Sequence, residues 1–216
     1  MKPNPFLKFL KNAPKIKTKG VRKIELFSYG KRGLIYTGVY RKKRVAIKVK
    51  RKESAAGDTI KNEAEKLKIL NRHKIGAKLM KLEGKKMIYE FIDGEFIEDY
   101  GEKCSRRELL KVIKEVFLQC YKMDKLGLNK EEMHHPVKHI IVRKKKPVMI
   151  DFERCHESEK PKNVTQFCQY IISSRMTHIM KEKALNADMK EMIRRAQEYK
   201  AKMSKKNLDR IIEAIK

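Results

Sequence analysis

The chain has 216 residues, of which 41% are hydrophobic, and a net charge of +28 from 55 basic and 27 acidic side chains. This length is enough for one domain or two small lobes with a buried core. No apolar run approaches the roughly 18 residues that a membrane helix needs, and the first residues lack the sustained apolar stretch of a secretory signal. The four cysteines form no C-x-x-C pair, which favours reduced thiols in a cytoplasmic protein.

The positive charge is concentrated near the amino terminus, where residues 1–52 carry 18 Lys and Arg but a single acid, Glu25. Such a region attracts polyanions, which include nucleotides, RNA and acidic proteins. A composition rich in Lys and Glu is also typical of proteins from hot environments, so both interpretations remain open. No aromatic-rich RNA motif accompanies the charge, and we expect no DNA specificity and no membrane partner.

The first half of the chain reads as short strands with one helix. Alternating apolar residues separated by charged turns predict an antiparallel meander, and apolar residues at helical spacing, with Asp58 as a cap, predict the helix. The expected elements are a basic arm or short helix over 1–22, strands over 23–30, 33–40 and 44–50, a helix over 58–72, and two strands around the turn Glu83-Gly84-Lys85.

The second half is mainly helical. Apolar stripes predict the helices, and a short hairpin is expected around a turn at Lys144 to Pro147. The expected elements are a helix over 106–126, the hairpin over 139–152, and helices over 163–182, 185–203 and 206–215. We therefore expect an α+β, bilobal architecture: a five-stranded antiparallel lobe with one helix over 23–92, then a small helical lobe over 93–216.

The stretch "SYGKRGLIY" (28–36) is a candidate phosphate cradle. Glycine lets backbone N–H groups approach phosphate oxygens without hindrance from a Cβ. Ser28, Gly30 and Gly33 occupy the three positions of a G-x-G-x-x-G loop, with Lys31 inside it and Ile35 as the apolar residue that follows. Ser28 departs from the first Gly of that pattern. On its own the stretch is more typical of a hairpin turn, where such glycines are far commoner than in phosphate loops.

Lys48 in "VAIK" lies inside an apolar strand, where a lysine needs a partner or a cleft. Fifteen residues later, Glu63 falls on the apolar stripe of the expected helix, whereas Glu65 falls on the opposite face. The pattern predicts an ion pair between Lys48 and Glu63 that holds the lysine on nucleotide phosphates. The following strand, "MIYEF", runs into a bend around Glu90 to Ile92, a pattern that is equally typical of a plain strand and turn.

Asp151 ends the apolar run "VMID", directly before Phe152. A carboxylate at the end of a strand is either an ordinary strand end or a ligand for a hard cation such as Mg²⁺. The glycine loop, Lys48 with Glu63, and Asp151 together supply the cradle, the cation and the metal ligand that phosphoryl transfer requires, which favours the metal ligand. Phe152 would then pack between the lobes.

These motifs resemble the protein-kinase-like superfamily, and especially its small atypical members, the RIO-type kinases and the kinase of the tRNA-modifying KEOPS complex. More narrowly, "EMHHPVKHIIV", "IDFERC" and "KNVTQFCQYI" look like an archaeal family of predicted Ser/Thr kinases. The resemblance covers roughly residues 24 to 182. It implies a bilobal kinase fold, ATP, and Mg²⁺ with Mn²⁺ as an alternative, and it leaves the protein or RNA substrate unnamed. In a kinase the bend after "MIYEF" is the hinge, so the resemblance also implies that the backbone from Glu90 to Ile92 contacts the adenine.

The catalytic loop departs from the kinase pattern H-R-D-x-x-x-x-N. Aligning the Asn to His139 puts His134 at the Asp position and Met133 at the Arg position. Under this alignment His134 would accept the proton of the acceptor hydroxyl, and His139 would join Asp151 on the metal. If His134 is not the base, the nearest acidic candidates are Asp124 and Glu132. Lys138 would neutralise the transferring phosphoryl group, or would simply be solvated.

Two other interpretations remain open. Five side chains near the loop invite a zinc site, although their spacing matches no standard finger; they are His134, His135, His139, Cys155 and His156. The unusual loop also fits a pseudokinase, a nucleotide-binding switch or an adaptor for RNA or protein. The leading expectation is an ATP- and Mg²⁺-dependent atypical serine/threonine kinase or ATPase.

Overall fold

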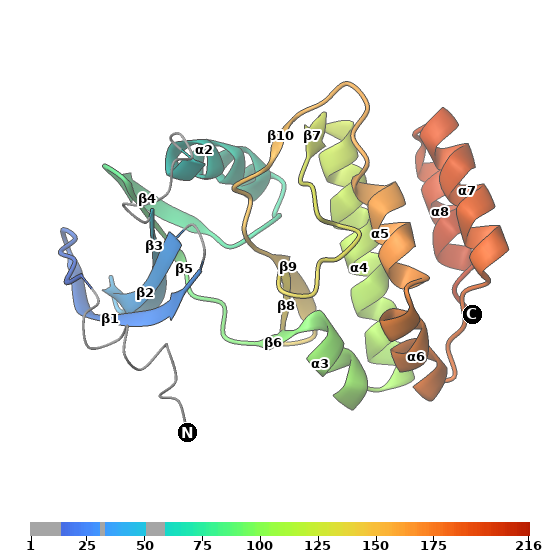
Figure 1. Ribbon diagram of the computed structural model, residues 1–216, viewed down its shortest axis with the longest axis horizontal. Helices are drawn as coiled ribbons and strands as arrows, with labels where there is room; N and C mark the ends of the chain where they lie inside the picture. Colours follow the sequence, from blue (N-terminus) through green and yellow to red (C-terminus); the bar gives the residue numbers. More distant parts are fainter. Residues whose placement is uncertain (1–13, 31–32, 51–58) are drawn as a thin grey trace, which may run out of the picture. The chain divides into compact units, whose positions relative to one another are not determined.

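The computed structural model describes residues 14–30, 33–50 and 59–216 (Figure 1). The predictions for Lys31 and for Asp58 as a helix cap lie outside these residues. The chain divides into two compact units. The first contains the described residues up to Asn71 together with Ala77–Phe91, and the second contains Arg72–Gly76 together with Ile92–Lys216.

The first unit is built on a five-stranded antiparallel sheet, as the sequence predicts (Figure 1). Its spatial order is β1-β2-β3-β5-β4, because β5 pairs with both β3 and β4. The helix α2 (Thr59–Arg72) follows β3 along the chain. The strands are β1 (Val21–Tyr29), β2 (Gly33–Tyr40), β3 (Lys43–Lys50), β4 (Leu79–Glu83) and β5 (Lys86–Glu90).

Residues 14–20, which we call the strap, lie across the face of this sheet opposite to Lys48. They cover a core whose buried members include Tyr36 and Ile47. Backbone oxygens of the strap accept hydrogen bonds from three side chains. These bonds run from Tyr36 Oη to Pro14 (2.7 Å), from Lys86 Nζ to Lys17 (2.6 Å) and from Lys81 Nζ to Lys19 (2.8 Å). The described part of the expected arm is thus extended chain packed on the sheet, not a helix.

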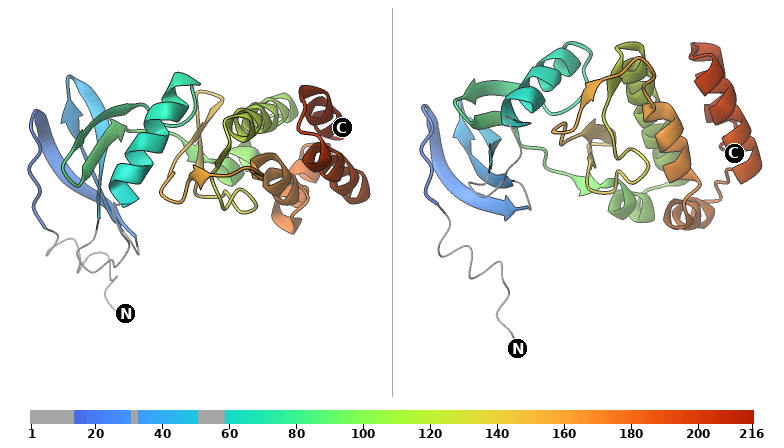
Figure 2. Two further views of the ribbon diagram at one scale, coloured as in Figure 1. Left: turned by 90° about the horizontal axis from the view of Figure 1, so that it is seen from above. Right: turned by 45° about the horizontal axis from the view of Figure 1, so that its top comes forward.

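The second unit is mainly helical, and Figure 2 shows its helices from two further directions. Helix α5 packs against α4 and α7, and α8 packs against α4 and α7. None of the described helices is long and apolar enough to cross a membrane. The helices are α3 (Ile97–Lys103), α4 (Arg106–Lys125), α5 (Asn163–Ile171), α6 (Ser174–Glu182), α7 (Met189–Ala201) and α8 (Lys205–Glu213). The short strands are β6 (Glu95–Phe96), β7 (Leu128–Asn129), β8 (Ile140–Arg143), β9 (Lys146–Met149) and β10 (His156–Glu157).

Helix α4 agrees with its prediction to within one residue. A capping box starts it: the Ser105 hydroxyl accepts from Glu108 N, and the Glu108 carboxylate accepts from Ser105 N. Its apolar stripe is buried, and the chain leaves the helix through Gly127, whose φ of +66° suits glycine. The helix therefore delivers a fixed starting point for the loop that follows.

Three predicted boundaries in this unit are wrong. The hairpin turn is only Lys144-Lys145, both with positive φ, because Pro147 already pairs with Val142 in the sheet. The helix predicted over 163–182 is divided in two, since Ser173 caps α6 by accepting a hydrogen bond from Met176 N. The helix predicted from residue 185 begins at Met189, where Asp188 is the cap. Helix α3 was not predicted.

Candidate active site

Lys48 and Glu63 meet inside the first unit. The two side chains are 7% and 2% exposed, and the Lys48 Nζ lies 2.6 Å from the Glu63 Oε2. Strand alternation directs Lys48 to one face of β3, and the apolar stripe of α2 carries Glu63 inward. The ion pair that the sequence predicts is therefore present.

Gly33 lies directly beside Lys48. A Cβ at Gly33 would be 3.2 Å from the Val49 carbonyl oxygen and 3.8 Å from the Lys48 Cε. Gly30 N donates to the Gly33 carbonyl at 2.8 Å, and Ser28 pairs with Ile35, so these described residues lie close together across the hairpin. A side chain at position 33 would crowd the Val49 carbonyl oxygen and would touch the lysine at ordinary contact distance, so the backbone of β3 is what favours glycine here.

Phe91, the residue that follows β5, contacts Arg44 of β3 and Phe27 of β1. Phe91 N donates to the Arg44 carbonyl at 3.3 Å, and the Arg44 guanidinium lies over the Phe91 ring, 3.9 Å from its centre. Phe27 meets the same ring edge-on at 5.1 Å. Glu90 ends β5, so the backbone from Glu90 to Ile92 leaves the sheet at the place that the sequence assigns to adenine contacts.

In the second unit, the β8–β9 hairpin brings His139 and Asp151 together. Ile140 pairs with Met149, and Ile150 N donates to the His139 carbonyl at 2.9 Å, so the two residues flank the open end of the hairpin. The His139 Nε2 lies 4.0 Å from the Asp151 Oδ2. Asp151 has a φ of +60°, a conformation that costs roughly 1 kcal/mol for a residue with a Cβ.

Glu132 is the third member of this group, and from the sequence it is, with Asp124, only an alternative to His134 as the base. Its Oε2 lies 3.8 Å from the same His139 Nε2, and its Oε1 accepts from the Arg154 Nη1 at 2.7 Å. Glu131 and Glu132 both have positive φ, 59° and 58°. Two other such pairs in this chain, Arg41-Lys42 and Lys144-Lys145, form two-residue hairpin turns, whereas Glu131 and Glu132 lie in a loop outside any described hairpin.

Lys130 anchors the start of this loop. It is 2% exposed, its Nζ donates to the Asp151 backbone oxygen at 2.7 Å, and the same ammonium lies 5.1 Å from the centre of the Phe152 ring. A buried lysine needs such partners. It connects the loop after β7 to the segment after β9. Phe152 is itself buried, with an exposed fraction of 1%.

A buried polar network supports the loop from below. Asp124 Oδ1 accepts from the backbone and side chain of Asn163 at 3.0 and 2.7 Å, and its Oδ2 accepts from Val164 N at 3.2 Å and Tyr199 Oη at 3.0 Å. Asn163 in turn accepts from Lys130 N at 2.8 Å. Burial raises the pKa of Asp124, and these four donors act in the opposite direction. The network joins α4, α5 and α7 to the loop.

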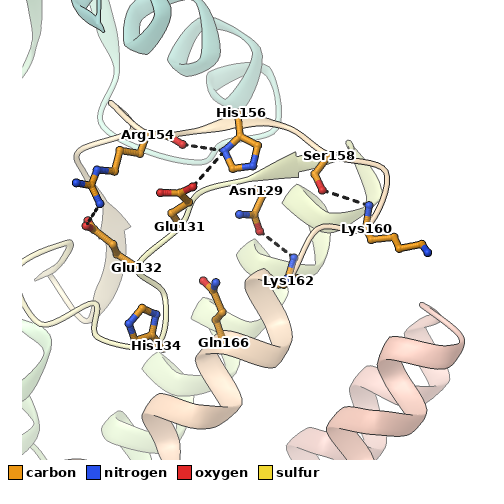
Figure 3. A pocket seen from close by; sticks show the side chains of 10 residues that line it. All are labelled: Asn129, Glu131, Glu132, His134, Arg154, His156, Ser158, Lys160, Lys162 and Gln166. Atoms are coloured by element: carbon orange, nitrogen blue, oxygen red, sulfur yellow. Dashed lines mark hydrogen bonds and ion pairs between the residues drawn. The ribbon is translucent and has the colours of Figure 1, made fainter. Parts of the chain in front are cut away.

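A polar cavity of about 570 Å³ opens beside the loop (Figure 3). His134, the predicted base, lines it, and the close-up shows the Glu132–Arg154 ion pair at another part of the rim. Lys138 is exposed. The side chains that line the cavity are Asn129, Glu131, Glu132, His134, Arg154, His156, Ser158, Lys160, Lys162 and Gln166.

The structure thus brings some of the predicted residues together and leaves others apart. It joins Lys48 to Glu63, and His139 to Asp151. Within the part of the chain that the structure describes, the histidines and Cys155 considered for zinc do not converge on one point. The sequence analysis missed Lys130 and Arg154, and it named Glu132 only as an alternative to His134; the signal for Glu132 was the pair of acids at 131 and 132, directly before the aligned motif.

Comparison with known proteins adds a fold but no activity. No protein-family model matches the chain. It is 34% identical over 76 residues to an uncharacterized protein, MJ1211, of Methanocaldococcus jannaschii, a match that covers 35% of this chain and 65% of that relative. The autoinhibited serine kinase domain of the giant muscle protein titin is similar in structure, with a TM-score of 0.53, 19% identity, and coverage of 63% of this chain and 45% of that one. The chain has a protein-kinase-like α+β fold.

Proposed function

We propose that the protein binds ATP with a divalent metal ion and transfers the γ-phosphoryl group, as an atypical serine/threonine kinase or as an ATPase. The observation that carries this proposal is the buried Lys48–Glu63 ion pair within a kinase-like fold. A buried ion pair contributes little net stability, so stability alone does not explain its presence. A lysine fixed by a carboxylate is, however, a suitable fixed cation for nucleotide phosphates.

The first unit would hold the nucleotide. Lys48, oriented by Glu63, would contact the phosphates, and the backbone around Gly30 and Gly33 would approach them. The position of Gly33 beside Lys48, with room for little more than a hydrogen against the Val49 carbonyl oxygen, supports this assignment. Ser28, Lys31 and Ile35 complete the proposed loop, and the backbone of Glu90 and Ile92 would contact adenine.

The second unit would hold the metal through Asp151 and His139. A carboxylate suits Mg²⁺ or Mn²⁺, whereas an imidazole is a less usual ligand for Mg²⁺, so the donor set fits in part. The 4.0 Å between the two donor atoms is compatible with one ion between them. When bound, the metal would neutralise charge on the phosphates. Lys138 is a second candidate cation for the transferring group.

The test is incubation of the purified protein with γ-labelled ATP and Mg²⁺ or Mn²⁺, scoring autophosphorylation and released phosphate, alongside the thermal shift that ATP produces. ATP that binds the folded state raises the melting temperature. We expect both a shift and label transfer. A shift without transfer would favour the pseudokinase, a switch or adaptor for RNA or protein. The absence of both would reject nucleotide binding.

A further inference from the structure

Two carboxylates lie near one imidazole nitrogen in the second unit. The His139 Nε2 is 3.8 Å from the Glu132 Oε2 and 4.0 Å from the Asp151 Oδ2. Glu132 thus stands beside the proposed metal site without belonging to the β8–β9 hairpin that supplies it. Its other oxygen is occupied by Arg154, at 2.7 Å. One oxygen of the carboxylate is therefore held, and the other is directed to the His139 side of the loop.

An ungapped alignment cannot find this residue. The kinase pattern H-R-D-x-x-x-x-N places the acid five residues before the Asn position. His134 is five residues before His139, but Glu132 is seven residues before it. The structure accommodates the two additional residues in two successive turns, closed by His135 N donating to the Glu132 carbonyl at 3.0 Å and His139 N donating to the Pro136 carbonyl at 2.8 Å.

The backbone around Glu132 is firmly held. Just before it, Lys130 N donates to Asn163 Oδ1; just after it, the buried Met133 donates its N–H to Gln166 Oε1 at 3.2 Å. Between these anchors the chain adopts two left-handed conformations. Because both anchors come from α5, the helix determines where the Glu132 carboxylate lies. His134, one residue beyond Met133, lines the cavity with its side chain exposed.

We propose that Glu132 is the catalytic carboxylate that orients the acceptor hydroxyl, in the role that the sequence alignment gives to His134. This inference rests on the proposed function. The acceptor oxygen forms a bond to the γ-phosphorus of ATP while the bond from that phosphorus to the bridging oxygen breaks. ADP leaves with the bonding electron pair, and the hydroxyl proton passes to the free oxygen of Glu132. The acceptor is a serine or threonine hydroxyl, or water in ATP hydrolysis.

Glu131 provides a matched control. It is the neighbouring glutamate, it shares the left-handed backbone, and its side chain is 41% exposed against 42% for Glu132. Its carboxylate faces His156, with 3.7 Å between the Glu131 Oε1 and the His156 Nδ1, and not His139 (Figure 3). Arg154→Gln is a second control, since it removes the ion pair to Glu132 and leaves the carboxylate.

The experiment measures label transfer from γ-labelled ATP and the ATP-induced thermal shift in the full chain. Glu132→Gln should lower transfer by about 100-fold or more while the thermal shift is retained. Glu131→Gln should stay within about twofold of the unmodified protein, and Arg154→Gln within about tenfold. Glu132→Asp keeps a carboxylate on a shorter side chain and should recover much of the transfer that Glu132→Gln loses.

Three results would overturn the inference. One is undiminished label transfer by Glu132→Gln. Another is a loss of transfer in Glu131→Gln equal to that in Glu132→Gln, which would indicate a merely structural effect of the loop. The third is loss confined to His134→Gln, which would assign the role to the histidine. Absence of both transfer and thermal shift in the unmodified protein would instead reject the proposed function, and this inference with it.

Discussion

Lys48 and Glu63 form an ion pair that is almost completely buried, with 2.6 Å between the ammonium nitrogen and the nearer carboxylate oxygen. Burial of two charges is costly, and their attraction offsets this cost only when the geometry is good. Apolar residues of similar volume would hold α2 on the sheet equally well. Stability alone therefore gives no reason for this pair, in line with the phosphate-binding role that we propose for Lys48.

The first prediction separates these two roles. Glu63→Gln leaves a buried ammonium without its carboxylate and should lower the free energy of unfolding by about 3 kcal/mol. The double variant Lys48→Met, Glu63→Leu should regain most of this stability but lose the ATP-induced thermal shift. Denaturant unfolding and thermal melts with ATP measure both quantities. Glu65→Gln, exposed on the same helix, is the control. A double variant that retains the ATP shift would disprove the phosphate role of Lys48.

Asp151 allows a similar test of the metal. Lys130 contacts the backbone oxygen of Asp151, so Asp151→Asn changes the side chain and leaves that contact in place. We expect the variant to fold normally and to lose most of the Mg²⁺ dependence of ATP binding. Titration of Mg²⁺ at fixed ATP, followed by thermal shift, measures this. An unchanged Mg²⁺ dependence would move the metal elsewhere and make Asp151 an ordinary strand end.

Asp124 is expected to be structural. Its carboxylate accepts four hydrogen bonds in the interior, and an amide would direct an N–H group toward some of those donors. Asp124→Asn should therefore lower the free energy of unfolding by about 3 kcal/mol. Asp209→Asn removes a carboxylate from an exposed pair with Lys205 and should cost less than about 0.5 kcal/mol. Urea denaturation distinguishes them; equal costs would contradict the role of the network.

Glu108 makes stability depend on pH. Hydrogen bonds from the Lys145 ammonium and from Ser105 lower the pKa of this carboxyl to about 2. Because the folded-state pKa is below the ordinary value, the stabilisation is present above about pH 4.5 and is lost as the pH falls toward 2. Glu108→Gln should show a smaller fall in urea midpoint between pH 5 and pH 2.5, and so should Lys145→Met. Curves of equal steepness in all three proteins would contradict the assignment.

The lysines of the strap allow a test of whether the positive charge near the amino terminus binds RNA. Lys15, Lys17 and Lys19 have exposed side chains, whereas their backbone holds the strap on the sheet. If RNA binds there, the logarithm of affinity should fall with the logarithm of salt by roughly 0.7 per phosphate contact. Changing all three lysines to Gln should reduce that slope. The matched triple change of Lys190, Lys200 and Lys206 to Gln should leave that slope unchanged. Salt-independent binding, or none, would leave composition as the explanation of the charge.

The sequence predicts what depends on local periodicity. The five strands and the inward position of Glu63 follow from alternation and from 3.6-residue spacing. The position of the Glu132 side chain does not follow from such periodicity. It depends on two left-handed residues and on hydrogen bonds to α5, which lies thirty residues further along the chain. The division between α5 and α6 was missed for a related reason: apolar spacing continues through Ser173, and only the cap bond to Met176 N ends the helix.

The strap also limits how the chain can be shortened for experiments. A chain beginning at β1 would remove the acceptors of Tyr36, Lys81 and Lys86 and would expose the apolar face that the strap covers. Uncovered sheet surface favours self-association. Recombinant versions intended for crystallisation or binding studies should therefore keep residues from Pro14 onward, and charge should be removed by substitution rather than by deletion.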